Sequence, residues 1–291
     1  MGAYNVLMLS RRSLLQAGSL AAALASAGRA KRLGAIGVQL YTARTVLPQH
    51  PLETLEAIEA AGYREIETGG VPVAQIWPSL QKTKLKAVSA HLDSKLVTQG
   101  PADELARTYA DLKEKGFTFA VFPYLPPNER GGRAAIQALA AKLNRAAEGA
   151  RAAGLRFCYH NHAFEFEPVD GEPLIHTLIA ETDPKLVGFE VDCFWVSVAG
   201  HDPAQAIHHV AGRVPLVHLK DKAADTPVRY NESVPRTTFK EVGSGTIDWP
   251  AVLKAASDAG VEHYFVEQDQ TPGDPVASLR QSFAYLSKLE I

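Results

Sequence analysis

The sequence has 291 residues, of which 46% are hydrophobic and 21% are charged, as in a globular protein with a substantial core. A formal net charge of −2, with no basic run longer than the pairs Arg11-Arg12 and Lys31-Arg32, excludes the electrostatic footprint of a nucleic-acid-binding protein. Only Cys158 and Cys193 occur, which excludes a disulfide scaffold and a C-x-x-C zinc or redox site.

The first segment of the chain, residues 1–30, resembles a twin-arginine export signal. Arg11-Arg12 is followed by a stretch of apolar and small residues and then by a small-x-small site at Ala25-Ser26-Ala27. The apolar stretch is too short for a membrane span of ~20 residues. We therefore expect cleavage near Ala27, no stable membrane anchor afterwards, and a periplasmic or secreted protein. The alternative is an N-terminal amphipathic helix.

The rest of the chain, residues 33–291, repeats one local pattern. A helical segment ending in Gly is followed at once by an apolar strand in AAGYREIETGG, EKGFTFAVFPY, AAGLRFCYHNH and DAGVEHYFVEQ. This is the helix-to-strand turn of a parallel sheet. Together with the remaining apolar runs, the pattern predicts eight strands, near residues 36–41, 64–69, 86–92, 118–124, 155–162, 186–193, 214–220 and 262–268.

Helices are predicted between these strands. One apolar stripe has helical period and consists of Ile136, Leu139, Ala140, Leu143, Ala147 and Ala150. Asp202-Pro203 and Asp274-Pro275 are typical helix starts. Eight β/α units without a linker predict an α/β protein with a single (β/α)8 TIM barrel domain. A doubly wound open sheet is the alternative, but no G-x-G-x-x-G motif follows the first strand.

Polar residues stand at nearly every predicted strand end, which in such barrels is the catalytic face. They are Gln39, Tyr41, Glu67, His91, Tyr124, His160, His162, Glu190, Asp192, His218, Lys220, Glu267 and Asp269. Any one of them can be a hydrogen-bonded structural group, but a ring of them at one mouth indicates a ligand site.

Four of these residues, on the fifth to eighth strands, form a candidate metal-binding set: His160, Asp192, His218 and Glu267. Mixed nitrogen and carboxylate ligands suit Mn²⁺, Fe²⁺, Co²⁺ or Zn²⁺ more than Ca²⁺, and Mg²⁺ is left open. His160 and His162 are two residues apart on one strand face, so only one of them can be a direct ligand. We expect it to be His160, at the same level as Asp192 and His218.

The segments YHNHAFEF, FEVDCFWV, VHLKDK, EVGSGTIDW and YFVEQD resemble the sugar phosphate isomerase/epimerase family. These are xylose isomerase-like TIM barrels of the AP endonuclease 2 superfamily, and they include inosose dehydratases, ketose 3-epimerases and the endonuclease IV group. The resemblance covers nearly all of residues 33–290 and implies a divalent metal held by the same four residues, His160, Asp192, His218 and Glu267.

The resemblance has one departure. In the epimerase members the fifth-strand ligand is a Glu that works with the eighth-strand Glu as a pair of bases, whereas this chain has Tyr159-His160-Asn161-His162 there. We therefore expect elimination or single-base isomerisation, as in members that resemble inosose dehydratase. Glu165 lies either in the site or on a solvent face.

Other residues of the ring receive provisional roles. Glu267, Lys220 and His91 are the candidate catalytic residues, and Trp195, His162, Gln39 and Tyr124 are the candidate substrate-binding residues. Lys220 is expected either to bind a substrate oxygen or to act as an acid or base with a lowered pKa, unless it pairs with a carboxylate. Gly243 and Gly245 precede a helix and offer a weak phosphate-cradle signal, with Asp248 as the helix cap.

Three functions are consistent with these residues, and the first is favoured because a pure binder gains nothing from a metal flanked by Glu267 and Lys220. The first is a metal-dependent sugar isomerase, epimerase or lyase that removes the proton next to a carbonyl of a free sugar, cyclitol or keto-glycoside. The second is a non-catalytic periplasmic sugar-binding barrel. With either function, a homo-oligomer is compatible with the sequence. An endonuclease IV-like repair role is the third, and it is disfavoured because the chain lacks a basic groove.

Overall fold

The computed structural model describes residues 33–290, so the predicted export signal lies outside the described residues. Eight parallel strands form a closed barrel, which confirms the predicted fold and rules out the open sheet. They are β1 (Ile36–Gln39), β2 (Glu65–Thr68), β3 (Lys86–His91), β4 (Phe119–Phe122), β5 (Arg156–His160), β8 (Val187–Asp192), β9 (Leu216–Leu219) and β12 (His263–Val266). Neighbouring barrel strands follow each other in the sequence, and β12 closes the ring against β1.

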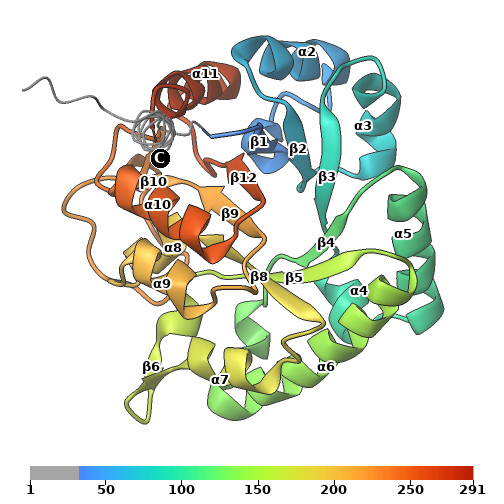
Figure 1. The fold of residues 1–291 in the computed structure, drawn as a ribbon, viewed down its shortest axis with the longest axis vertical. Coiled ribbons are helices and arrows are strands. Elements are labelled where there is room, and N and C mark those ends of the chain that lie inside the picture. Colours follow the sequence, from blue (N-terminus) through green and yellow to red (C-terminus); the bar gives the residue numbers. More distant parts are fainter. Residues whose placement is uncertain (1–32, 291) are drawn as a thin grey trace, which may run out of the picture.

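The helices surround the barrel (Figure 1). They are α2 (Pro51–Ala61), α3 (Val73–Leu80), α4 (Ser94–Gln99), α5 (Ala102–Glu114), α6 (Gly132–Ala152), α7 (Leu174–Glu181), α8 (Cys193–Val198), α9 (Pro203–His209), α10 (Trp249–Ala259) and α11 (Pro275–Leu286), with short 3-10 turns η1 (Leu40–Ala43), η2 (Pro127–Glu129), η3 (Phe164–Phe166) and η4 (Arg236–Thr238). The predicted apolar stripe of α6 is buried along its length. Across residues 33–290, none of the helices combines the length and apolar character needed to cross a membrane.

The predicted turn chemistry is confirmed at both ends of the helices. Asp202, Asp248 and Asp274 each cap a helix by accepting a backbone N–H, from Ala204, Ala251 and Val276 respectively. Gly62 ends α2 with a φ of 116°, where a side chain would be strained and would strike the ring of Phe283. Local sequence therefore determines where these helices begin and end.

An apolar plug fills the middle of the barrel and separates its two ends. It consists of Val88, Phe119, Val121, Cys158, Leu216 and Phe265, all buried. Gly37 on β1 makes room for it, because a Cβ there would collide with the ring of Phe265. Polar side chains lie on both sides of the plug. Glu65 and His263 lie at the amino end of the strands and the candidate site lies at the carboxyl end.

Two small antiparallel ladders extend the loops of the carboxyl end. β6 (Pro168–Val169) pairs with β7 (Glu172–Pro173), and β10 (Asp221–Lys222) pairs with β11 (Phe239–Lys240). The second ladder closes the base of the long loop between β9 and α10, which carries residues 223–238. That loop adds Glu232, Val234 and Arg236 to the lining of the cavity described below.

Candidate metal centre and substrate cavity

The cavity lies over the carboxyl ends of the barrel strands and has a volume of about 830 Å³. His91, His160, Lys220 and Glu267 line it from the strand ends. Tyr124, His162, Trp195 and Phe239 form an aromatic wall on one side, and Tyr41, Gly69, Gly70 and Val71 lie among the residues of the opposite side. A cavity of this size holds a small organic ligand.

Three of the four predicted metal ligands gather into one group, here called the outer group: Asp192, His218 and Glu267. Glu267 Oε2 lies 3.1 Å from His218 Nδ1, and Asp192 Oδ2 lies 3.7 Å from the same nitrogen. All three side chains are buried. These donors come from β8, from β9 and from the residue after β12, which are neighbouring strands of the barrel.

His160 reaches the outer group from a different level than predicted. The strand register pairs Asp192 with His218 but pairs His160 with Glu190, two residues before Asp192. The expectation of a common level was wrong for His160, because barrel strands are tilted and staggered. Its ring still points toward the outer group, with Nε2 3.8 Å from Asp192 Oδ2.

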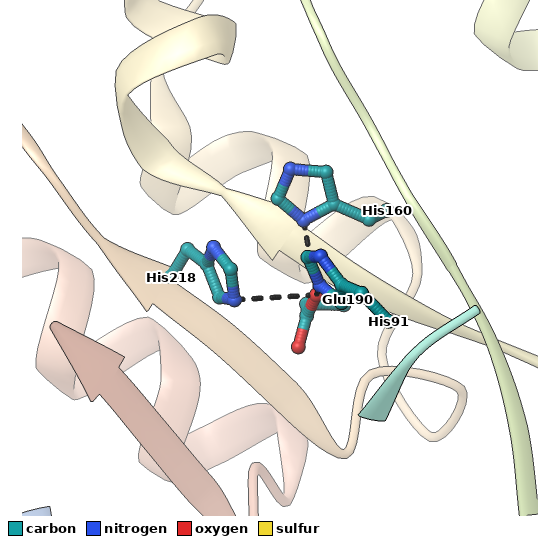
Figure 2. Close-up of side chains that lie close together, drawn as sticks. All are labelled: His91, His160, Glu190 and His218. Atoms are coloured by element: carbon teal, nitrogen blue, oxygen red, sulfur yellow. Dashed lines mark hydrogen bonds and ion pairs between the residues drawn. The ribbon is translucent and has the colours of Figure 1, made fainter. Parts of the chain in front are cut away.

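Beneath the outer group lies a second cluster, here called the inner group: Glu67, His91 and Glu190. Figure 2 shows Glu190 in contact with the rings of His160, His218 and His91. Glu190 Oε2 is 2.9 Å from His91 Nε2, 3.0 Å from His160 Nδ1 and 3.2 Å from His218 Nε2. Glu67 Oε2 lies 2.6 Å from His218 Nε2 and 3.1 Å from His91 Nε2. The imidazoles of His160 and His218 therefore each turn one nitrogen toward the inner group and the other toward the outer group.

The carboxylates of the inner group are stabilised by the imidazoles around them. Burial alone would raise the pKa of Glu67, but His91 and His218 lower it. Burial and the charge of Glu67 would raise the pKa of Glu190, but His218 and His160 lower it to about 2. Burial opposes protonation of His91, yet the charge of Glu67 and hydrogen bonding to Glu190 raise its pKa to about 10. His91 thus carries a positive charge between two carboxylates.

Lys220 behaves differently from the prediction. Its Nζ lies 3.1 Å from Asp192 Oδ2, 2.6 Å from Glu267 Oε2 and 2.7 Å from Asp269 Oδ1. Burial would lower the pKa of Lys220, but Asp192, Asp269 and Glu267 together raise it well above its ordinary value. The expected lowering is therefore wrong. Lys220 is a buried cation, and pairing with Glu267 was the alternative that sequence reasoning had named.

The outer group fits a divalent cation. Asp192 Oδ2 is buried and accepts no hydrogen bond of suitable geometry from residues 33–290, although Lys220 Nζ is near it. Burial lowers the pKa of His160 well below its ordinary value, so this ring is neutral. With its proton on Nδ1 toward Glu190, its Nε2 lone pair faces Asp192. Asp192 Oδ2 and His160 Nε2 thus present an oxygen and a nitrogen acceptor 3.8 Å apart, and such a donor set suits a divalent transition metal.

The predicted substrate-binding residues separate into two sets. Tyr124, His162 and Trp195 line the cavity, and the His162 ring stacks on Trp195 with 5.4 Å between centroids. Gln39 instead lies below the cavity, where its Nε2 donates to Glu67 and its Oε1 accepts from Tyr41 N. Its amide thus donates and accepts hydrogen bonds within the protein.

Two remaining sequence alternatives are resolved by hydrogen bonds. Glu165 lies inside the protein, where its carboxylate accepts from the Tyr159 hydroxyl at 2.6 Å and from the backbone N–H of His162. The N–H groups of Gly243 and Gly245 donate to Asp221 Oδ2, so the glycine segment holds a side chain of the protein. The phosphate-cradle signal is therefore explained by Asp221.

Sequence reasoning left Glu67, Glu190 and Asp269 without a role, although each was recognised at a strand end. The available signal was the two-residue spacing of Glu190 with Asp192 and of Glu267 with Asp269, which places each pair on one face of its chain segment. Their importance follows from their partners, since His91, His218 and Lys220 belong to other strands. Spacing along one strand cannot identify such partners.

Comparisons with known proteins agree with this architecture. An inosose dehydratase from Geobacillus thermodenitrificans is 31% identical over 143 residues, which are 46% of this chain and 47% of that protein. The chain spans about half the length of the curated relatives it matches. A solved sugar phosphate isomerase/epimerase from Parabacteroides distasonis covers 90% of this chain, and 95% of its own, with 24% identity and a TM-score of 0.71.

A second solved structure, the IOLI protein with a bound zinc atom, has 15% identity and a TM-score of 0.66 over 89% of this chain and 99% of its own. These two likenesses show the fold. The family model for xylose isomerase-like TIM barrels matches residues 28–289, nearly the whole length of the sequence. The chain therefore belongs to the xylose isomerase-like TIM barrel family.

Proposed function

We propose that this protein is a metal-dependent enzyme that removes the proton next to a carbonyl group of a polyhydroxylated substrate. The observation that carries the proposal is the outer group at the floor of a wide cavity, where Asp192 Oδ2 is buried beside Lys220 Nζ without a hydrogen bond of suitable geometry and faces two imidazole nitrogens. The inosose dehydratase named among its relatives and the zinc-bound structure of the same fold support the proposal. A sugar-binding barrel without turnover has no use for such a group.

The metal would be held by Asp192, His218, Glu267 and His160. A divalent ion there supplies a Lewis acid that polarises the carbonyl and stabilises the negative charge that develops when the proton leaves. The proposed ion is Mn²⁺, Co²⁺, Fe²⁺, Zn²⁺ or Mg²⁺.

The proton chemistry is assigned to one side of the substrate. Glu267 lines the cavity beside Lys220, whereas the fifth strand contributes the neutral imidazole of His160. An imidazole that serves as a metal ligand cannot also take the proton. His160 therefore does not provide a second base on the side of the substrate opposite Glu267. Glu267 then acts as the base and Lys220 holds the substrate oxygen or protonates the leaving group. We infer elimination or single-base isomerisation rather than two-base epimerisation.

The substrate class follows from the walls of the cavity. Trp195, His162 and Tyr124 provide flat surfaces for the apolar face of a ring. The charged floor suits the oxygen-rich face of a sugar or cyclitol, and the volume of about 830 Å³ also accommodates a keto-glycoside. The proposed partner is thus a small carbohydrate.

The decisive experiment combines metal analysis with proton exchange. The protein is loaded separately with Mn²⁺, Co²⁺ and Zn²⁺ and incubated in deuterated buffer with inososes, ketoses and 3-keto-glucosides. We expect deuterium incorporation next to the carbonyl, abolished in Glu267→Gln. If the loaded protein binds one of these compounds without exchange, the sugar-binding barrel is the correct function.

We also propose export through the twin-arginine segment, on the strength of Arg11-Arg12 and the small-residue site near Ala27. Replacement of both arginines by lysine is expected to keep the protein in the cytoplasm. Unchanged export of that variant would remove the proposal without affecting the enzyme.

A further inference from the structure

The two shared imidazoles, those of His160 and His218, each have a choice of which nitrogen carries the proton. A neutral imidazole binds a metal only through the nitrogen that lacks a proton. His160 must leave Nε2 free, and His218 must leave Nδ1 free, for both to act together with Asp192. Something in the protein therefore has to hold the proton on the opposite nitrogen of each ring.

The inner group supplies one acceptor for each of these protons. His160 Nδ1 lies 3.0 Å from Glu190 Oε2, and His218 Nε2 lies 2.6 Å from Glu67 Oε2. Both are within hydrogen-bond distance, and both nitrogens face away from the outer group. The two rings, which use opposite nitrogens, are thus directed by two different carboxylates.

Glu67 is itself fixed in place by other donors. Ser89 Oγ donates to Glu67 Oε1 at 2.5 Å, and Gln39 Nε2 donates to Oε2 at 2.8 Å. His91 Nε2 lies between Glu67 and Glu190 at 3.1 Å and 2.9 Å, so one N–H connects the two carboxylates. The His91 ring also stacks on that of His218, with 5.6 Å between centroids and an interplanar angle of 14°. This arrangement restricts rotation of the rings as well as their tautomers.

We propose that Glu67 and Glu190 are positioning residues that hold His218 and His160 in the tautomers required for metal binding, with His91 linking the two carboxylates. The proposal rests on the function proposed above, because it assigns the metal to the outer group. Carboxylates behind metal-ligating histidines typically contribute 10- to 100-fold to metal affinity. The inner group is then a support for the metal centre and is not a second metal site.

The chain offers a matched control on the same strand. Glu65 precedes Glu67 by two residues and its Oε2 lies 2.8 Å from Nδ1 of His263, at the opposite end of the barrel. Glu65→Gln therefore removes a carboxylate from a Glu–His pair that lies outside the candidate site. Glu190→Gln and Glu67→Gln remove the same charge behind His160 and His218.

The first measurement is metal affinity, by competition of Zn²⁺ or Co²⁺ with a chelator. We expect Glu190→Gln and Glu67→Gln each to weaken binding 10- to 100-fold and Glu65→Gln to leave it unchanged. Equal affinity in all three variants would overturn the proposal. It would also be overturned if Asp192→Asn kept full affinity while Glu190→Gln lost it, because the ion would then sit in the inner group.

The second measurement uses the metal-free protein, so it does not depend on the proposed function. Histidine ¹⁵N chemical shifts report which ring nitrogen carries the proton. In the wild type we expect the proton of His160 on Nδ1, and in Glu190→Gln a mixture of tautomers. If the wild type binds no metal but the substitution still changes the His160 tautomer, the proposed function fails while the control of this tautomer by Glu190 stands. An unchanged His160 signal in a folded Glu190→Gln variant would refute the positioning role.

Discussion

Two Glu–His pairs on opposite ends of the same barrel show how surroundings decide what a pair can do. Glu65 and Glu67 both point from β2 toward a histidine, His263 and His218 respectively. The His263 side chain retains 23% exposure, whereas the Glu67 and His218 side chains are completely buried. The first pair has the apolar plug on one side and solvent on the other. The second adjoins further charged groups that solvent does not screen.

The difference lies in the number of partners. Glu65 has one imidazole partner, while Glu67 contacts His91, His218, Gln39 and Ser89. A partly exposed ion pair contributes little to stability. A fully buried one is costly to break, because removal of one partner leaves an uncompensated charge. We therefore expect substitutions at the carboxyl end to affect metal and chemistry, and substitutions at the amino end to have small effects.

The largest effect is expected at Asp192, whose Oδ2 has no hydrogen bond within the described chain. Asp192→Ala should lower metal affinity by more than ~100-fold, beyond the range of a supporting residue. The barrel should still fold, because the apolar plug and the helix contacts remain. Metal content after dialysis and the circular dichroism spectrum check both parts. Full occupancy in this variant would show that the outer group is not the metal site.

The next effect distinguishes the two histidines of the fifth strand. His160→Ala should lose the metal, because the proposed ligand set then lacks its fifth-strand donor, and His160→Glu should restore binding. His162→Ala should retain the metal, because His162 packs against Trp195 and Tyr124 on the cavity wall. Isothermal titration of all three variants with Co²⁺ provides the comparison. The opposite ranking would shift the ligand assignment by two residues.

These two predictions also show what the sequence could and could not determine. Helix caps and αβ turns depend on residues adjacent in the chain, so the eight barrel strands and the caps at Asp202 and Asp274 were predictable. The level of His160 was not, because strand stagger is a property of the closed barrel. The pKa direction of Lys220 depends on Asp192, Glu267 and Asp269, which only the three-dimensional structure brings to one point.

A smaller effect concerns a buried carboxylate that has no imidazole in contact. Burial raises the pKa of Glu165 from an ordinary value of 4.5 to about 7, although Tyr159 and the N–H of His162 oppose this. The folded state then binds more protons than the unfolded state between these values, so stability should fall as pH rises from about 4.5 to 7. The loss is at most ~3 kcal/mol.

Glu165→Gln tests this pH dependence. The variant cannot ionise at this position, so its free energy of unfolding should lack the wild-type decrease across that interval. Urea unfolding at several pH values measures the difference between the two proteins, in which groups common to both cancel. Parallel curves for the two proteins would show that the pKa of Glu165 is the same in the folded and unfolded states, and the predicted effect of burial would be wrong.

The smallest effect is expected for Glu65→Gln. The amide oxygen of Gln can still accept the hydrogen bond from His263 Nδ1, and solvent screens the charge that is lost. We expect a change of less than ~1 kcal/mol in the free energy of unfolding and no change in metal affinity or turnover. Urea unfolding and metal titration of Glu65→Gln and Glu67→Gln compare the free energy of unfolding and the metal affinity at the two ends of β2. A loss of metal affinity in Glu65→Gln as large as that in Glu67→Gln would mean that the apolar plug transmits the charge of one end to the other, and the separation of the two ends would have to be abandoned.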